Sequence, residues 1–511
     1  MSVAQALDAA PQVKNKLPYR RYRCLFNHEF MLFCDTGISR KIIEAYIEKF
    51  KDTDVDAVMC CPLAHRTNLF PSKVDPGWKT YDTITDQAWM KHFKNALKYI
   101  YDGGDPVAET LAVCRRLDKG FFISYRMNDL HSVEFKNFPT HNAFWREHPE
   151  YWLADTDIHA DCSRDDVRLF NWMIPEVREH YFAVIEELAT SYDVDGIELD
   201  FMRCWRLFRD NETEAGVPVL TAFVQRIRAM LDRLGKARGK YLQLCVRVLS
   251  TPERGRKFGI DVGAWDRQGL IDMVNVSNCL VNSTEVGIES YKEIAPQCRI
   301  YGEMNSITRQ ISVPGGSKYR YVQTAHYRAT ALNYLTRADG ISFFNTDWVS
   351  FPQREALLPV FKGIATVPFL QRQSKAYGIY SVLEWCQVAS TLPAKDTAHL
   401  TLITGEDTGK NTFERAVLRL ETDEQCTGMN IEVRLNGTLL NECEHHDTEL
   451  FPIPDQGYAA LYPGREVLKF YSVPLTLIRF GKNEVILNNS SRGKGSLTFA
   501  EIQLALYAPK E

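Results

Sequence analysis

Short apolar runs alternate with amphipathic runs from residue 19 to residue 347, and only a few folds accommodate such a pattern. Eight apolar runs have the length and composition of strands: residues 23–29, 57–62, 121–128, 196–201, 242–250, 273–278, 299–305 and 340–347. Runs with helical spacing lie between them, at residues 40–51, 86–101, 106–117, 175–191, 219–234 and 321–335. Eight strands with interleaved helices predict an α/β fold, a (β/α)8 or TIM barrel, over residues 19–364.

A doubly wound parallel sheet is the alternative arrangement of alternating strands and helices. It needs fewer strands and usually carries a glycine-rich loop that binds a nucleotide. The chain contains neither Gly-x-Gly-x-x-Gly nor Gly-x-x-x-x-Gly-Lys-Ser/Thr. The barrel is therefore the favoured prediction.

The pattern changes after residue 364. Residues 400–403, 416–420, 430–435, 467–471, 484–487 and 496–506 are short alternating runs, separated by turn pairs such as Asn436-Gly437 and Pro463-Gly464. Short alternating runs separated by turns are typical of an all-β sandwich, which we expect as an accessory domain over residues 365–511. Residues 1–18 form an N-terminal extension in this scheme.

Composition excludes several classes of function. Hydrophobic residues make up 45% and charged residues 25% of the chain, which is the composition expected of a globular protein. The formal net charge of -4 does not indicate the excess of basic residues with which proteins bind nucleic acid or an anionic membrane. The polar N-terminus lacks the apolar core of a signal peptide or of a transmembrane helix, so we expect no membrane association. Thirteen cysteines is an odd number without framework spacing, which favours reduced thiols and a cytoplasmic location.

The fourth expected strand carries two acidic side chains. Side chains alternate along a strand, so Ile197 and Leu199 share one face while Glu198 and Asp200 share the other. Two carboxylates on the inward face of a barrel strand are costly to bury unless they have a role. This strand is therefore the first place to look for a functional site.

The seventh expected strand carries another acidic side chain, Glu303, near its end. The C-terminal ends of barrel strands form the catalytic face, where strands four and seven lie opposite each other. Two carboxylates in that arrangement can hydrolyse a glycosidic bond. We predict Glu303 and Asp200 as catalytic residues, with Glu198 one pleat deeper as a second acidic candidate or as a structural partner. The alternative is a buried salt bridge to Arg247 or Arg203.

Polar and aromatic side chains at or near the other strand ends are candidates for holding sugar hydroxyl groups. For each of them, a structural hydrogen bond or a place in the core is the competing interpretation. The candidate substrate-binding residues are His28, Glu29, Arg66, Arg126, Asn128, Asp129, Trp172, Arg203, Arg247, Asn275, Tyr301, Asp347 and Trp348. Further tryptophans that could stack on sugars are Trp145, Trp152 and Trp205.

Five arginines near strand ends suggest a second hypothesis, because a neutral sugar does not require them. They could bind a sulfate or a carboxylate on an acidic polysaccharide fragment. Equally, they could neutralise Glu198, Asp200 and Asp129. The five are Arg66, Arg126, Arg203, Arg206 and Arg247.

The segment from Asn171 to Arg178, followed by the motif Asp-Gly-Ile-Glu-Leu-Asp-Phe-Met-Arg that ends at Arg203, resembles bacterial barrel proteins classed as glycoside hydrolases or glycosidase-like proteins acting on polysaccharides. In retaining enzymes of the large clan with this architecture, the acid/base lies on strand four and the nucleophile on strand seven. The resemblance implies that Glu303 is the nucleophile. The Asn-Glu pair that ends strand four in that clan is absent here, which leaves the acid/base between Asp200 and Glu198. The C-terminal sandwich resembles accessory β-domains of such enzymes.

We therefore expect a glycoside hydrolase that cleaves poly- or oligosaccharides, including anionic ones, by a retaining, two-carboxylate mechanism without cofactor or metal. The alternative is a non-catalytic carbohydrate-binding protein on a degenerate barrel. A Schiff-base lyase is disfavoured because no expected strand ends in lysine. Metal catalysis is disfavoured because strand one offers the single His28 in place of a His-x-His pair. The expected partner is the carbohydrate, and the sequence leaves a homo-oligomer open.

Overall fold

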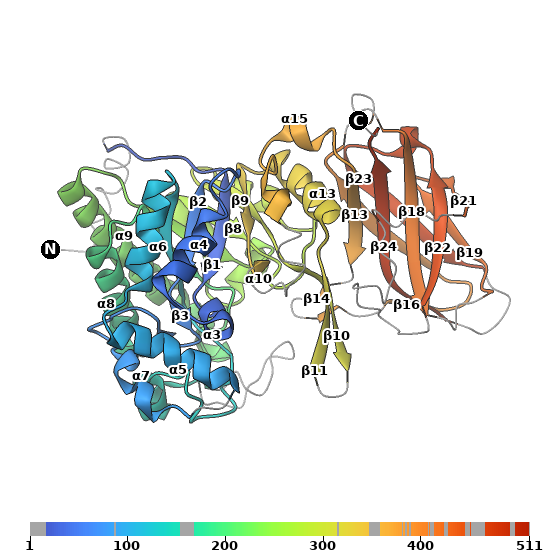
Figure 1. Ribbon diagram of the computed structural model, residues 1–511. Helices are drawn as coiled ribbons and strands as arrows, with labels where there is room; N and C mark the ends of the chain where they lie inside the picture. The colour runs from blue at the N-terminus through green and yellow to red at the C-terminus, as the bar shows by residue number, and fades with distance from the viewer. Residues whose placement is uncertain are drawn as a thin grey trace. The chain divides into compact units, whose positions relative to one another are not determined.

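The computed structural model describes residues 17–85, 88–153, 168–313, 316–346, 358–380, 382–383, 386–387, 390–406, 408, 413–423, 428–444, 450, 466–490 and 496–509. The chain forms two compact units, each assembled from separate stretches of sequence (Figure 1). The first unit comprises Met1–Ser277, Gly287–Gly302 and Ser342–Trp348, and the second comprises Asn278–Val286, Glu303–Ile341 and Val349–Glu511. The domain boundary expected after residue 364 stays a prediction.

Eight strands close into a parallel barrel, which confirms the expected fold class. Their order around the barrel is β1-β12-β9-β8-β7-β6-β5-β2. The strands are β1 (Cys24–Glu29), β2 (Ala57–Cys61), β5 (Gly120–Arg126), β6 (Gly196–Asp200), β7 (Gln243–Val248), β8 (Met273–Val276), β9 (Arg299–Met304) and β12 (Gly340–Phe343). Each lies within or beside one of the eight predicted apolar runs.

Helices alternate with these strands, and their termini follow local sequence signals. Ser39 caps α4 by accepting a hydrogen bond from the amide of Ile42, and Asp105 caps α6 by accepting from the amides of Val107 and Ala108. The main helices are α4 (Arg40–Glu48), α5 (Ala88–Tyr101), α6 (Pro106–Arg116), α8 (Pro175–Ser191), α9 (Thr213–Arg238), α11 (Val262–Arg267), α12 (Ile288–Ile294) and α13 (Thr324–Leu335). In the described part of the chain, no helix combines the length and the apolar character needed to span a membrane.

Shorter elements lie in the loops of the barrel. They are α3 (Leu32–Thr36), β3 (Leu63–Ala64), β4 (Thr67–Asn68), η1 (Gly77–Thr83), α7 (Ala143–Glu147), η2 (Pro149–Tyr151), η4 (Asp210–Glu212) and α10 (Pro252–Arg256). Several of them follow the C-terminal ends of β2, β5 and β6, where loops of a barrel form its binding sites.

The barrel interior changes from apolar to polar along the strands. Near the start of the strands, Leu25, Ala57, Phe122 and Met273 belong to one buried cluster. Further along, the alternation of side chains brings polar residues to the same inward face. These inward polar residues are Ser124 and Arg126 on β5, Glu198 and Asp200 on β6, Arg247 on β7 and Asn275 on β8. The polar end is the C-terminal end, where barrel active sites lie.

The second unit contains the C-terminal sandwich, built from two antiparallel sheets (Figure 1). Alternating residues such as Leu418, Leu420, Val433, Val485 and Leu504 form its core. One sheet contains β13 (Lys375–Tyr380), β24 (Leu497–Tyr507), β18 (Arg415–Asp423), β22 (Glu466–Val473), β21 (Asn441–Glu442) and β16 (Ser390–Leu392), and the other contains β17 (Thr397–Thr404), β23 (Gly481–Asn489), β19 (Ile431–Leu435) and β20 (Thr438–Leu439).

The second unit also contains a hairpin of β10 (Ile307–Val313) and β11 (Gly316–Tyr321). Arg320 ties β11 to the sandwich, because its Nη1 lies 2.8 Å from Glu421 Oε2 and 3.0 Å from Glu501 Oε2. All three side chains are buried. The remaining short elements are β14 (Val382–Leu383), β15 (Cys386–Gln387), η6 (Leu358–Phe361), α15 (Val367–Leu370) and η8 (Leu475–Leu477).

Candidate active site

Asp200 is the last residue of β6, and its register neighbours are Arg126 on β5 and Arg247 on β7. Arg247 Nη1 donates a hydrogen bond to Asp200 Oδ1 over 2.9 Å, and the amide of Met202 donates to the same oxygen over 2.7 Å. The salt bridge weighed as an alternative from the sequence is therefore present. Both contacts use the carboxylate as an acceptor, and a charge-assisted bond of this kind is strong in a buried site.

Arg247 is itself held in place by its surroundings. Its Nη2 donates to Ser277 Oγ over 3.3 Å, and its guanidinium carbon lies 3.5 Å from the centre of the Phe344 ring. The side chains of Arg247 and Asp200 are almost completely buried. The ion pair is thus a fixed feature of the barrel mouth.

Glu198 lies one layer deeper, as the alternation along β6 requires. Its carboxylate accepts a hydrogen bond from Ser124 Oγ over 2.7 Å, and it lies 3.4 Å from both Cys245 Sγ and Asn275 Nδ2. The Glu198 side chain is fully buried. Its contacts join β5, β6, β7 and β8, which suits a structural role.

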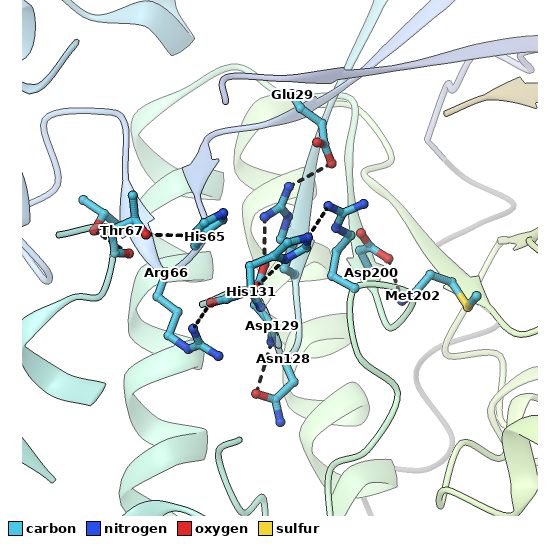
Figure 2. A network of polar contacts seen from close by, with 12 residues as sticks. Glu29, His65, Arg66, Thr67, Asn128, Asp129, His131, Asp200 and Met202 are labelled. Atoms are coloured by element: carbon cyan, nitrogen blue, oxygen red, sulfur yellow. Dashed lines mark hydrogen bonds and ion pairs between the residues drawn. The ribbon is translucent and has the colours of Figure 1, made fainter. Parts of the chain in front are cut away.

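Buried Arg126 connects three segments around the mouth, and Figure 2 labels the two residues that it contacts, Glu29 and Asp129. Arg126 donates from Nη2 to Glu29 Oε1 over 2.9 Å and from Nη1 to Asp129 Oδ2 over 2.7 Å. Glu29 ends β1, and Asp129 lies in the loop after β5. Two carboxylates can remain charged in this interior because the guanidinium lies between them.

Asp129 also orients a histidine. Its Oδ1 lies 2.7 Å from His131 Nδ1 and accepts a hydrogen bond from the His131 amide over 2.8 Å. Burial alone would raise the pKa of Asp129, but His131 and Arg126 outweigh burial and hold that pKa well below its ordinary value. The other ring nitrogen, His131 Nε2, lies 3.1 Å from Arg203 Nη2. His65 stacks on His131, with 4.9 Å between ring centres.

Arg66 lies beside His131 and holds the loop that carries this histidine. Its Nη1 lies 3.1 Å from His141 Nδ1 and donates to the carbonyl of His131 over 3.3 Å. His141 Nε2 in turn lies 2.9 Å from the carbonyl of Ser132. Burial lowers the pKa of His141 to about 4, with Arg66 as a further cause. His141 is therefore neutral at pH 7, with Nε2 as its donor and Nδ1 as its acceptor.

A small pocket opens next to Arg66. Two arginines, two histidines and a carboxylate are among its lining groups, so it can contact both anionic and neutral polar groups. Its lining residues are Leu63, His65, Arg66, Tyr125, Arg126, Asp129, Asn142, Phe170, His180 and Tyr181. In the described part of the chain, Nε and Nη2 of Arg66 have no hydrogen-bond partner although they are buried.

Two further predicted binding residues have structural contacts. Asn128 Nδ2 donates to the carbonyls of Phe170 and Arg206, each over 3.0 Å, and so joins the loops after β5 and β6. Trp172 is completely buried, and its Nε1 donates to the carbonyl of Met127 over 3.1 Å. Trp145, Trp152 and Trp205 are also buried, which leaves none of these four rings exposed as a sugar platform.

The remaining predicted residues lie at different depths. His28 is on the face of β1 opposite Glu29, and its ring stacks on Tyr46 of α4 at 4.8 Å. Tyr301 is deep in the apolar cluster and donates to the carbonyl of Tyr22 over 2.7 Å. Asp347 and Trp348 lie outside the described residues.

Glu303 lies in β9. The first residues of this strand belong to the first unit of the chain, whereas Glu303 belongs to the second. Within that unit, Asn305 Nδ2 lies 3.5 Å from Glu303 Oε1, and the hydroxyl of Tyr334 donates to the Glu303 carbonyl over 3.4 Å. In the barrel order, β8 and β7 separate β9 from β6. The pairing of Glu303 with Asp200 stays a prediction.

The sequence interpretation missed His131. It is a lone histidine in a loop without periodicity, and only the pattern Asp129-x-His131 directly after a strand could have pointed to it. The described residues contain no group of three or more histidine, cysteine or acidic side chains arranged to hold a metal ion.

No known protein family matches the chain, and no curated protein does so either. Among solved structures, the PgaB glycoside hydrolase domain from Bordetella bronchiseptica aligns with a TM-score of 0.44 and 10% identity over 68% of this chain and 99% of that one. A bacterial fucosidase in complex with an inhibitor aligns with a TM-score of 0.39 and 11% identity over 97% and 96% of the two chains. A cycloisomaltooligosaccharide glucanotransferase from Paenibacillus sp. aligns with a TM-score of 0.34 and 8% identity over 94% of this chain, which spans only 57% of that enzyme. Likenesses this distant do not assign an activity.

Proposed function

We propose that this protein is a glycoside hydrolase whose central catalytic group is Asp200. The observation that carries the proposal is the position of this carboxylate, buried on the inward face at the C-terminal end of β6 and oriented by Arg247. That end of a parallel barrel is where catalytic residues lie. Carboxylates in such places can attack or stabilise an anomeric carbon.

The contacts of Asp200 suit one of the two roles in a retaining mechanism better than the other. It accepts hydrogen bonds from Arg247 and from the Met202 amide, which suits a carboxylate that attacks the anomeric carbon. Glu303, the second proposed carboxylate, then protonates the leaving oxygen. This exchanges the two roles that the family resemblance implies, and Glu198 becomes a structural residue.

Replacing each proposed carboxylate tests the function. On oligosaccharides, whose leaving oxygen needs a proton, we expect Asp200→Asn and Glu303→Gln each to lower kcat by about 10²-fold to 10⁴-fold. Asp272→Asn is the matched control, because Asp272 is also buried and paired with an arginine, Arg228 at 3.2 Å, but precedes β8 at the opposite end of the barrel. Asp272→Asn should lose stability and keep its turnover number.

Two results would contradict the proposal. If both carboxylate variants cleave every tested glycoside as fast as the unmodified protein, the catalytic pair is wrong. If the unmodified protein binds oligosaccharides without cleaving them, it is the carbohydrate-binding protein of the alternative hypothesis.

Arg66 supports the finer proposal that the substrate is anionic. Arg126 and Arg247 bind carboxylates of the protein itself, and Arg206 Nη2 donates to Asp210 over 2.8 Å. Among the described residues, Arg66 makes no ion pair, and two of its nitrogens lack a partner. Both nitrogens are buried, so a sulfate or carboxylate of the substrate would reach them only through the small pocket beside Arg66. Equal turnover of sulfated, uronate-containing and neutral oligosaccharides would contradict this.

The proposed location is the cytoplasm. Ten cysteines have described side chains, all are free thiols, and nine of them are buried. Reduced, buried thiols are typical of cytoplasmic proteins.

A further inference from the structure

His131 and Asp129 form a carboxylate–histidine pair directly after β5, next to the strand that ends in Asp200. Asp129 Oδ1 lies 2.7 Å from His131 Nδ1, and Arg126 binds the other oxygen of Asp129 over 2.7 Å. The carboxylate is thus held from two sides. A histidine oriented in this way presents its second nitrogen, Nε2, in a defined direction.

The contact of Nε2 defines the protonation state of the ring. Arg203 has only donors, and its Nη2 lies 3.1 Å from His131 Nε2, so Nε2 carries the lone pair and Nδ1 carries the hydrogen that faces Asp129. Partial burial of the ring and the charge of Arg203 lower the pKa of His131, although Asp129 raises it, and the net direction is downward. The ring is therefore neutral at pH 7 and can accept a proton at Nε2.

The His131 side chain is far more exposed than the carboxylate that orients it. Its side chain is 37% exposed, whereas that of Asp129 is 3% exposed. Glu29, Arg126, Asp200 and Arg247 are all buried. Among these side chains, His131 is thus the titratable one that is in contact with water.

His131 is also tied to the surroundings of Asp200. The amide of Met127 donates to the Asp200 carbonyl over 2.8 Å, so the chain leaves β5 alongside the end of β6. Arg203, which contacts His131, lies only three positions after Asp200. Figure 2 shows the contact of His131 with Asp129 and, near it, the contact of Asp200 with Met202.

We propose that His131 is the general base of the proposed glycoside hydrolysis, oriented by Asp129 and acting in its second step. This inference rests on the proposed function.

In the first step the anomeric carbon forms a bond to an Asp200 oxygen as the leaving oxygen takes the proton of Glu303. In the second step, with Arg203 displaced from Nε2, His131 takes a proton from water. The water oxygen bonds to the anomeric carbon, and the bond to Asp200 breaks with its electron pair returning to the carboxylate. The imidazolium releases its proton to solvent, from which Glu303 regains its own.

Kinetics with 2,4-dinitrophenyl glycosides test this role, using whichever glycoside the unmodified protein cleaves. Their leaving group departs readily, so formation of the glycosyl-enzyme is fast and its hydrolysis limits turnover. In His131→Gln we expect kcat to fall by about 10²-fold to 10⁴-fold and KM to fall with it, because the intermediate accumulates. The ratio kcat/KM should stay unchanged, and a burst of dinitrophenol should precede the slow phase. Azide needs no general base and should restore the turnover of His131→Gln.

His148→Gln is the matched control. Its Nδ1 lies 2.8 Å from a carboxylate oxygen of Glu150, and its side chain is 38% exposed. His148 thus forms a carboxylate–histidine pair of similar exposure that does not belong to the group around Asp129. It should behave as the unmodified protein does. An unchanged kcat in His131→Gln would overturn the inference and leave the proposed function standing. A loss of kcat/KM without a burst and without azide rescue would show that His131 is structural, and inactivity of the unmodified protein on every glycoside would overturn both proposals.

Discussion

At the scale of single residues, the barrel mouth depends on charges that neutralise one another. Arg126 is the clearest case, because its two contacts reach Glu29, 97 positions away, and Asp129, three positions away. A buried charge without a partner costs several kcal/mol. We therefore expect the Arg126 guanidinium to be necessary for the stability of the barrel mouth.

Removing this guanidinium should destabilise the protein strongly. Arg126→Met keeps much of the side-chain volume but leaves Glu29 and part of Asp129 uncompensated, so we expect the free energy of unfolding to fall by about 3–5 kcal/mol. Urea denaturation measures this. Arg40→Met is the control, because the pair of Arg40 with Glu44 is exposed and its loss should leave the midpoint unchanged. Equal midpoints for both variants would show that the Arg126 pairs add no stability.

At the scale of elements, packing explains why β6 begins with a glycine, Gly196. A Cβ atom added to Gly196 would lie 2.2 Å from the carbonyl oxygen of Gln243 and 2.5 Å from the ring of Phe122. The strand therefore packs against β7 and the barrel core without room for a side chain at this position. Because Gly196 precedes Glu198 and Asp200, any shift there would also move both carboxylates.

Gly196→Ala should accordingly destabilise the barrel. One of the two groups in the way is a backbone carbonyl, so a strand must shift to make room for the added methyl group. We expect the free energy of unfolding to fall by about 1–3 kcal/mol. The thermal unfolding midpoint provides the measurement. Gly77→Ala is the comparison, because its Cβ would meet only the methyl group of Thr67 at 3.4 Å. A Gly196→Ala midpoint as high as that of Gly77→Ala would contradict the packing argument.

At the scale of the whole molecule, stability should depend on pH through histidines that the fold keeps neutral. His141 illustrates this, because both of its ring nitrogens are engaged, one by Arg66 and one by the carbonyl of Ser132. Burial lowers its pKa to about 4 in the folded protein, whereas the value in an unfolded chain is about 6.5. Between these values the unfolded chain binds a proton that the folded protein does not, so acid favours unfolding.

The free energy of unfolding should therefore decrease as the pH falls from about 6.5 toward 4, by about 1.4 kcal/mol per pH unit for this one group. His141→Phe removes the titrating ring, so its stability should depend less steeply on pH in that range. Denaturation curves at a series of pH values measure the slope. Between pH 8 and 9 hardly any His141 is protonated in either state, and the two proteins should have equal slopes. Equal slopes below pH 6.5 as well would rule out this role of His141.

The sequence by itself determined the barrel, the sandwich and the position of the acidic face. These features follow from periods of two and 3.6 residues, which are properties of neighbouring positions along the chain. The same alternation placed Glu198 below Asp200 at the end of β6, where the structure has them. It also placed the predicted side chains of β5, β7 and β8 at the polar end of the barrel.

Only the tertiary structure decided which partners these side chains have. Arg247 binds Asp200 from 47 positions away and Arg203 contacts His131 from 72 positions away, and no local pattern encodes such distances. For the same reason, the sequence could not show that Arg66 makes no ion pair in the described part of the chain. Nor could it show that Trp172 is buried in the core and so not exposed to stack on a sugar. His131 owes its place in the network to Asp129 and Arg203, which come together only when the ends of β5 and β6 lie side by side. Periodicity is local, whereas charge pairing and burial depend on contacts between distant segments.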